Sequence, residues 1–223
     1  WMAIADAGLI GSLIPTEYGG SGMGLLALTI ASERMASHGF GNAMIVLTAM
    51  DSLCILRNGT EEMKKRFLPE VAKGKMKFCF ALTEPDAGSN TFRLKTTAKK
   101  NGKGYLLNGQ KTFITGVDVA DYMLTAARTT SIDEAQKKGL PKAYGISLFV
   151  LDTKSKGIEL QVIPTHGIEG MNQFTIFFDN VEVPAENMVG QENLGMMALF
   201  NSLNPERILA SATAVGMSEY VIK

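Results

Sequence analysis

The spacing of apolar residues predicts helices in the first third of the chain. Leu25–Ser37 contains neither glycine nor proline, and Ala43–Leu56 is apolar almost throughout, which is typical of a helix buried on most sides. A further helix begins after Thr60, a good N-cap residue, and Pro69 should kink or restart that helix. Residues 1–75 are therefore expected to form a helical region.

The pattern changes to strands at Met76. The expected strands are Met76–Thr83, Thr96–Lys100, Tyr105–Asn108, Lys111–Thr115, Tyr122–Arg128 and Ile146–Asp152, followed by an alternating segment at Phe174–Phe178. Asn101–Gly104 carries a hairpin signal. The polar stretch Thr129–Ala143 is interpreted as a solvated hairpin loop, and a helix follows Gly195.

This order of elements predicts an α+β chain. Helices come first, then many strands without intervening helices, then a helix again, which favours a separate antiparallel β-domain of barrel or sandwich type. We expect the regions 1–75, 76–190 and 191–223. The chain starts and stops inside helical patterns, so we expect a fragment.

One glycine-rich stretch invites a dinucleotide-binding interpretation. Gly22–Ala27 fits the letters of the G-x-G-x-x-G/A fingerprint. No strand–helix–strand unit surrounds it, and no acidic residue follows at the required distance. A tight loop between helices, in which glycine supplies left-handed conformations, is favoured instead.

Composition narrows the classes of function. The chain of 223 residues is 46% apolar and 20% charged, with 22 basic and 22 acidic residues, as in an ordinary globular protein. Zero net charge gives no footprint for nucleic acid and no polybasic membrane anchor. No segment is apolar enough to insert into a membrane. Cys54 and Cys79 lie in apolar runs and are expected to be reduced and buried.

Two segments are candidates for cofactor contact. In Phe78–Asn90 a strand runs into a loop of Thr, Pro, Asp, Gly and Ser, and the simplest interpretation is a strand and a turn. The alternative is that its N–H groups and hydroxyls face a flat heterocycle that gathers negative charge. In Asn108–Gly116, Phe113 is suited to cover the face of an aromatic ring, and Thr115 is suited to reach a ring nitrogen. A strand with ordinary alternation also explains both residues.

Taken together, several motifs resemble the acyl-CoA dehydrogenase family. They are T-E-P-x-A-G-S at Thr83–Ser89, N-G-x-K-x-x-I-T at Asn108–Thr115, F-x-x-V-x-V-P-x-x-N at Phe178–Asn187, Leu203-Asn204-Pro205-Glu206-Arg207, and the early stretch Leu9–Gly20. They occur in the family's order and cover essentially the whole chain. The resemblance implies N-terminal helical and middle β-domains and the first helix of a C-terminal helical bundle.

The resemblance also implies FAD as the cofactor. By similarity, the flavin-contacting residues are Phe80, Ala81, Leu82, Thr83, Gly88, Ser89, Phe113, Ile114 and Thr115. Thr83 would donate to the N1/O2 side of the flavin and Thr115 to N5. Asp86 stands where the family has a small residue, and it is expected to point to solvent because an acid disfavours a reduced flavin anion. The implied reaction is α,β-dehydrogenation of an acyl-CoA, with hydride passing to flavin N5.

The residues expected on the substrate side are Ser89, Met197, Asn204, Glu206 and Arg207. In one group of the family the catalytic base is a Glu directly before an Arg, which makes Glu206 the candidate base. The alternative is a first-turn Glu that stabilises a helix start after Pro205. Met197 is either a pocket residue or plain core. Arg207 is either an anchor near the CoA or an ion-pair partner within the bundle.

The implied partners are an acyl-CoA substrate and an electron-transferring flavoprotein. The family also implies a homotetramer and a place in fatty acid metabolism, in the bacterial cytoplasm or the mitochondrial matrix. Two other functions stay open because a fold does not fix chemistry: a flavin monooxygenase or acyl-CoA oxidase, and a non-catalytic acyl-CoA-binding fragment.

Overall fold

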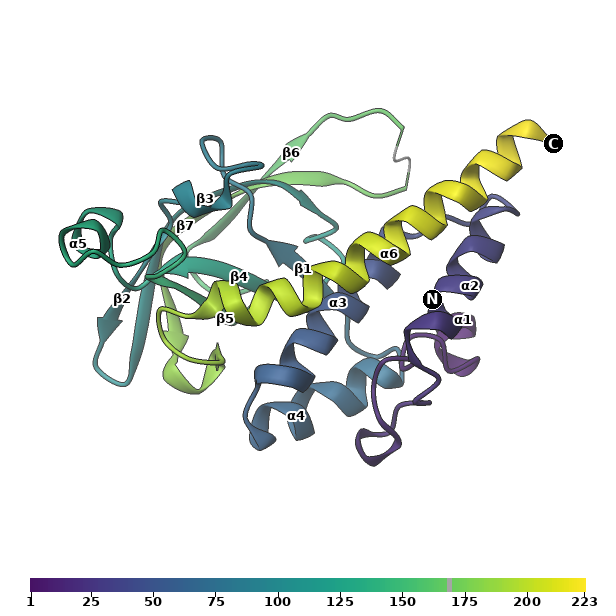
Figure 1. Cartoon of the computed structure of the whole chain (residues 1–223), viewed down its shortest axis with the longest axis horizontal. Coiled ribbons are helices and arrows are strands. Elements are labelled where there is room, and N and C mark those ends of the chain that lie inside the picture. Colours follow the sequence, from purple (N-terminus) through teal and green to yellow (C-terminus); the bar gives the residue numbers. More distant parts are fainter. Residues whose placement is uncertain (168–169) are drawn as a thin grey trace. The chain divides into compact units, whose positions relative to one another are not determined.

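The computed structural model describes residues 1–167 and 170–223, which form two compact units (Figure 1). The helical unit contains Trp1–Lys77 and Phe200–Lys223, and the sheet unit contains Phe78–Leu199. The boundary falls inside the last helix, α6 (Gly195–Ile222). The predicted order of helices, strands and helix is confirmed.

The helical unit is built from amphipathic and buried helices. Its elements are α1 (Met2–Asp6), the 3-10 turn η1 (Thr16–Tyr18), α2 (Gly24–Ala36), α3 (Ala43–Asn58), α4 (Glu61–Ala72) and the part of α6 that begins at Phe200. The Asn42 side chain caps α3 by accepting from the Met44 N–H, and Thr60 caps α4 by accepting from the Met63 N–H. As expected, α3 is buried along most of its length.

The segment 19–23 is an irregular loop between η1 and α2, and the loop between helices was predicted. Gly19, Gly22 and Gly24 all have positive φ angles, which explains the glycines without a nucleotide. The helix α4 was expected to kink or restart at Pro69, but it runs unbroken from Glu61 to Ala72. Pro69 sits in its third turn, where packing of the buried Phe67, Leu68 and Val71 compensates for the lost backbone hydrogen bond.

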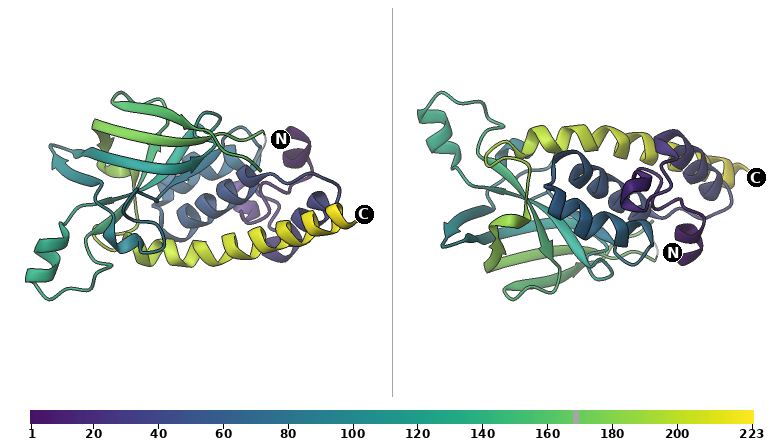
Figure 2. Two further views of the ribbon diagram at one scale, coloured as in Figure 1. Left: turned by 90° about the horizontal axis from the view of Figure 1, so that it is seen from above. Right: turned by 90° about the horizontal axis from the view of Figure 1, so that it is seen from below.

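Within the helical unit, α6 runs antiparallel to α3 and close to α2 (Figure 2). Gly41, just before α3, faces Thr213 and Met217 of α6, whereas Cys54 near the end of α3 faces Ser202. The closest approach is at Gly216, where an added Cβ would lie 2.1 Å from the Glu33 carbonyl oxygen of α2. Only a residue without a side chain fits this crossing.

We therefore expect Gly216→Ala to lower the free energy of unfolding by about 1–3 kcal/mol, as overpacking does. Helix propensity alone predicts the opposite sign, a gain of about 1 kcal/mol for alanine over glycine. Urea denaturation followed by circular dichroism measures the difference. Val215→Ala, at an exposed position of the same helix, is the control and should change little. A stabilised Gly216→Ala variant would contradict this helix crossing.

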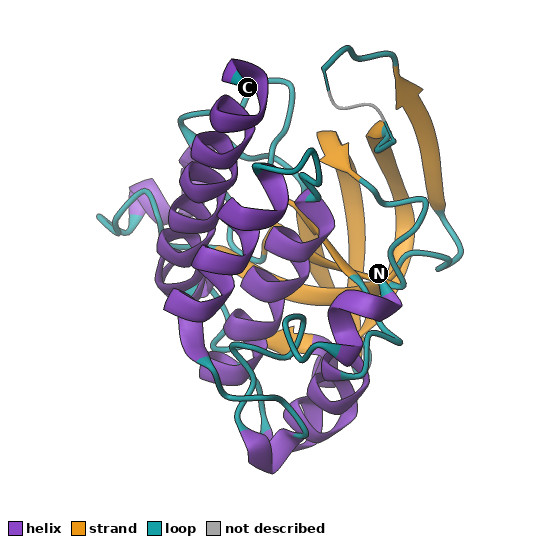
Figure 3. Ribbon diagram, turned by 90° about the vertical axis from the view of Figure 1, so that its right-hand side faces the viewer, coloured by secondary structure: helices purple, strands orange, loops and turns teal. Residues whose placement is uncertain are grey.

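The sheet unit is one eight-stranded sheet, drawn in orange in Figure 3. Its strands are β1 (Phe78–Ala81), β2 (Thr97–Asn101), β3 (Gly104–Thr115), β4 (Tyr122–Arg128), β5 (Ile146–Asp152), β6 (Ile158–Ile163), β7 (Gln173–Pro184) and β8 (Met188–Val189). They pair in the order β6-β7-β3-β2-β4-β5-β8, with β1 beside β4. Short 3-10 turns lie at η2 (Thr91–Arg93) and η3 (Ala185–Asn187).

The sheet is mainly antiparallel, with β1 and β2 parallel to β4. The hairpin predicted at Asn101–Gly104 joins β2 and β3, with Gly102 in the left-handed region at φ 56°. The two strands expected at Tyr105–Asn108 and Lys111–Thr115 are one long strand, β3. Its register against β7 shifts twice, between Leu107 and Gly109 and between Lys111 and Ile114. These irregularities hid the continuity in the sequence pattern.

Two other expectations need correction. Thr129–Ala143 connects β4 to β5 but is not only a loop, because it contains the short helix α5 (Ile132–Lys137), which Figure 2 shows beyond the end of the strands. The Ser131 side chain caps α5 by accepting from the Glu134 N–H, a signal that the polar composition concealed. The strand β6 was not predicted, although Ile158, Leu160 and Val162 alternate with polar residues along it; the strand is largely exposed.

Cys54 and Cys79 are free and buried, as predicted. Within residues 1–167 and 170–223, no helix has both the length and the apolar character needed to cross a membrane.

Candidate functional site

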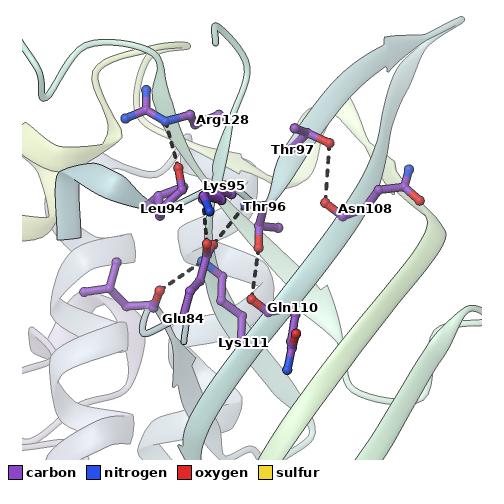
Figure 4. A network of polar contacts seen from close by, with 10 residues as sticks. Glu84, Leu94, Lys95, Thr96, Thr97, Asn108, Gln110, Lys111 and Arg128 are labelled. Atoms are coloured by element: carbon purple, nitrogen blue, oxygen red, sulfur yellow. Dashed lines mark hydrogen bonds and ion pairs between the residues drawn. The ribbon is translucent and has the colours of Figure 1, made fainter. Parts of the chain in front are cut away.

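The loop after β1 is fastened to β3 by a buried ion pair (Figure 4). Lys111 is fully buried, and its Nζ donates to Glu84 Oε1 at 2.8 Å and to the Leu82 carbonyl at 3.0 Å. Glu84 also accepts hydrogen bonds from the backbone N–H groups of Lys95 and Thr96. One carboxylate thus connects the loop to β3 and to the segment that leads into β2.

Backbone contacts fix the same loop on both sides of Glu84. The Thr112 N–H donates to the Thr83 carbonyl at 2.9 Å. Glu84 and Ala87 exchange backbone hydrogen bonds of 3.1 and 3.0 Å, which closes the turn. The structure therefore brings the two predicted flavin segments together, Phe80–Ser89 from β1 and Phe113–Thr115 from β3.

Phe113 has an unusual conformation for a strand residue. Its φ is 55°, and 62% of its side chain is exposed. An L-residue in this region is strained by roughly 1–2 kcal/mol. It lies at the second register shift of β3, between Lys111 and Ile114, and such irregularities re-aim side chains. An exposed aromatic face of this kind fits a planar ring system.

Thr115 offers a hydrogen-bond donor two residues further on. Its Oγ1 accepts from Gln173 Nε2 of β7 at 2.7 Å. Because that lone pair is occupied, the hydroxyl hydrogen of Thr115 is free to donate elsewhere. An aromatic face and an oriented hydroxyl, both on β3, suit the isoalloxazine ring of a flavin.

The remaining predicted flavin contacts differ in exposure. Ala81, Leu82 and Ile114 are buried, Phe80 and Thr83 are half-buried, and Gly88 and Ser89 are exposed. Asp86 is exposed and pairs with Lys95 at 2.8 Å, in keeping with the expectation that it points to solvent. Leu82 and Glu84 thus anchor the loop, whereas Gly88 and Ser89 are accessible to a ligand.

Burial and the attraction between the two charges act in opposite directions on this pair. Burial alone would raise the pKa of Glu84, but the charge of Lys111 and the hydrogen bonds from Lys111, Lys95 and Thr96 bring it below its ordinary value of 4.5. Burial lowers the pKa of Lys111 to about 8, while Glu84 opposes that shift. The charge of Glu84 thus offsets part of the effect of burial on Lys111.

This shift predicts acid sensitivity. A carboxyl with a lowered pKa stabilises the fold above its unfolded pKa, and that contribution is lost as the pH falls through the folded pKa. We expect the free energy of unfolding to decrease below about pH 4.5. The Glu84→Gln variant should be less stable at neutral pH but lose less on acidification. Urea denaturation across pH 3–7 measures both slopes, and parallel slopes would contradict the assignment.

The substrate-side residues Asn204, Glu206 and Arg207 lie on α6 in the helical unit. Asn204 Oδ1 accepts from Arg207 Nη1 at 2.8 Å, so Arg207 has an amide partner on its own helix. Pro205 was considered as a helix start, but it lies inside α6. Glu206 is therefore not a first-turn residue, and that alternative for it is wrong.

Glu206 is half-buried, and burial raises its pKa although Arg207 opposes the shift. A carboxyl with a raised pKa is a stronger base once it has ionised, as proton abstraction requires. Met197, at the start of α6 in the sheet unit, is 67% exposed. The alternative that it is plain core is therefore wrong for this chain.

Sequence reasoning missed several polar residues near these sites. Lys111 and Glu84 are members of the sequence motifs but were given no role, and Gln173 was not considered. Asp51, which is fully buried in α3, was also missed. A signal existed for Asp51, because it is the only charged residue in the apolar run Ala43–Leu56.

Comparison with known proteins agrees with this geometry. Residues 1–75 match the model of the acyl-CoA dehydrogenase N-terminal domain, and residues 79–181 match that of the acyl-CoA dehydrogenase middle domain. The acyl-CoA dehydrogenase FadE12 of Mycobacterium tuberculosis is 38% identical over 223 residues, which is all of this chain and 56% of the relative. This chain thus spans about half the length of the curated relatives that it matches.

Two solved structures illustrate the similarity of fold. Butyryl-CoA dehydrogenase from Megasphaera elsdenii has a TM-score of 0.88 at 30% identity, covering 99% of this chain and 57% of the other. The prolyl acyl carrier protein oxidase AnaB has a TM-score of 0.86 at 29% identity, covering 100% of this chain and 58% of the other. On the evidence of both domain models and of these relatives, the chain belongs to the acyl-CoA dehydrogenase family.

Proposed function

We propose that the protein containing this chain is an FAD-dependent acyl-CoA dehydrogenase that introduces a double bond between the α and β carbons of an acyl-CoA. The observation that carries this proposal is the fastening of the Leu82–Ser89 loop to β3 at Lys111 and Thr112. It sets an exposed Phe113 and the Thr115 hydroxyl on one rigid frame, as a bound flavin requires.

Different residues of this chain would make different contacts with the flavin. Phe113 would cover one face of the flavin, and Thr115 and Thr83 would donate hydrogen bonds to its ring edge. The Lys111–Glu84 pair keeps these groups in place without touching the cofactor. When bound, FAD supplies the acceptor for the hydride that leaves the β carbon.

The proton chemistry falls to Glu206. Its carboxylate would take the α-proton of the thioester, while the hydrogen on the β carbon would leave with its two electrons. The two electrons of the broken α C–H bond form the new carbon–carbon bond. Ser89, Asn204, Arg207 and Met197 are proposed to contact the acyl-CoA. We further propose an electron-transferring flavoprotein as electron acceptor, a homotetramer, and a cytoplasmic or mitochondrial location.

The test is a purified full-length protein with a flavin absorbance spectrum that oxidises an acyl-CoA with an artificial electron acceptor but not with oxygen alone. Similarity to AnaB, an oxidase by name, makes oxidase chemistry the second candidate, and oxygen consumption without another acceptor would favour it. A protein that takes up no FAD would instead indicate a non-catalytic acyl-CoA-binding role.

The role of Phe113 gives a separate prediction. Phe113→Gly should weaken FAD binding by about 2- to 12-fold, corresponding to the roughly 0.5–1.5 kcal/mol of an aromatic contact. The same change relieves the left-handed strain, so the apoprotein should become no less stable. Phe113→Trp, which keeps an aromatic face, is the matched control. Fluorescence titration of the apoprotein with FAD measures the affinity, and unchanged binding by the glycine variant would exclude the contact.

A further inference from the structure

A line of polar side chains crosses the apolar contact between α3 and α6 in the helical unit. On α3, Asp51 and Cys54 are three residues apart, and on α6, Ser202 and Glu206 are four apart, so each pair lies on one helix face. The helices run antiparallel, which sets Cys54 opposite Ser202 and Asp51 in electrostatic contact with Glu206. The candidate base therefore has a second carboxyl as its neighbour.

Asp51 lies at a position where a buried carboxyl group lowers the stability of the fold. It is 0% exposed, and neither of its side-chain oxygens has a hydrogen-bond partner among the residues that the structure describes. Burial, followed by the charge of Glu206, raises its pKa well above the ordinary value. Burial also raises the pKa of the neighbouring Cys54 to about 12. An apolar side chain would be more favourable for folding at this position, so packing does not account for Asp51.

Few charged groups surround Asp51 and Glu206. Among the described residues, the charge of Glu206 acts on Asp51, and the charge of Arg207 acts on Glu206. Arg57, in the last turn of α3, acts on the neighbouring Cys54. Arg57 and Arg207 are both exposed. The helix α4, which also packs on α3, buries only apolar side chains, namely Met63, Phe67, Leu68, Val71 and Ala72. Glu206 is thus the one charged group that acts directly on Asp51.

We infer that Asp51 and Glu206 form a coupled carboxyl pair, in which the charge of the ionised Glu206 keeps Asp51 protonated. This inference rests on the proposed role of Glu206 as the base. Two neighbouring buried carboxyls do not both ionise readily. Glu206 is only half-buried and has Arg207 beside it, so it ionises first, whereas Asp51 keeps its proton. The pair then loses its protons in two separate steps.

The first test is an infrared titration of the full-length protein. The C=O stretching band of a protonated carboxyl group reports whether Asp51 holds its proton. The wild-type protein should show this band at neutral pH, and Asp51→Asn should lack it. In Glu206→Gln the band should titrate at a pH about one unit or more lower, because the neighbouring charge is gone. A missing wild-type band, or the same midpoint in Glu206→Gln, would overturn the pairing. This readout does not depend on turnover.

The second test is the pH profile of kcat/KM for acyl-CoA oxidation. The wild-type profile should contain two ionisations, and Asp51→Asn, which keeps the shape of the side chain, should contain one. Ser52→Ala is the matched control, because Ser52 is also buried on α3 and its hydroxyl donates to the Thr48 carbonyl in its own helix, and its profile should follow wild type. An Asp51→Asn profile superimposable on wild type would show a merely structural role. Absence of oxidation by the wild-type protein would refute the proposed function instead, while the infrared result on the pairing would stand.

Discussion

Replacing Glu206 with glutamine in the full-length protein is expected to lower kcat by about 10²–10⁴-fold, the usual contribution of a general base. Glutamine keeps the size of the side chain but accepts no proton at neutral pH. The flavin contacts proposed for Thr83, Phe113 and Thr115 lie in the sheet unit, so FAD content should not change. Steady-state rates with an artificial electron acceptor and the flavin absorbance spectrum measure the two effects separately.

Glu219→Gln is the matched control, because Glu219 is an exposed glutamate on the same helix, and its rate should equal that of wild type. The raised pKa of Glu206 adds a second expectation. Since only the carboxylate takes a proton, activity should rise with pH through a pKa above the usual range of a glutamate. Retained turnover in Glu206→Gln would show that the base is another residue.

Replacing Lys111 with methionine should destabilise the sheet unit by about 3–5 kcal/mol, the usual cost of breaking a buried ion pair. The variant leaves the Glu84 carboxylate buried without its cation and removes the hydrogen bond to the Leu82 carbonyl. The loop before Ser89 then keeps the backbone bond from Thr112 but loses both side-chain bonds to β3, so FAD affinity should fall as well. Chemical denaturation of the apoprotein and flavin titration measure these two losses.

An exposed pair in the same unit provides the control. Lys138 and Glu134 of α5 form an ion pair of 2.7 Å with both side chains mostly in solvent, so Lys138→Met should cost less than about 1 kcal/mol. The double variant Lys111→Met/Glu84→Gln should be less destabilised than the sum of its two single variants, because it no longer buries an unpaired charge. Strict additivity would contradict direct coupling between Lys111 and Glu84.

Much of the architecture could be predicted from the sequence because it depends on local rules. The burial of α3 follows from its apolar composition, the start of α4 from the Thr60 cap, and the β2–β3 hairpin from Asn101–Gly104. Strands β4 and β5 were predicted with their observed limits, since each is a buried run between polar segments. The short helix α5 and the exposed strand β6 were missed although each has a local signal, the Ser131 cap and the alternation over Ile158–Val162.

The candidate sites depend on contacts that no local pattern encodes. The sequence by itself determined the family, the order of the elements and the residues proposed to bind the flavin. Only the tertiary structure decided that Lys111 and Glu84 form one buried pair across 27 positions, and that Phe113 is strained and exposed. It also decided that Asp51 is fully buried with no hydrogen-bond partner for its carboxyl oxygens among the described residues. The physical reason is that burial and charge pairing arise between segments far apart in the chain, whereas propensity and capping act within a few residues.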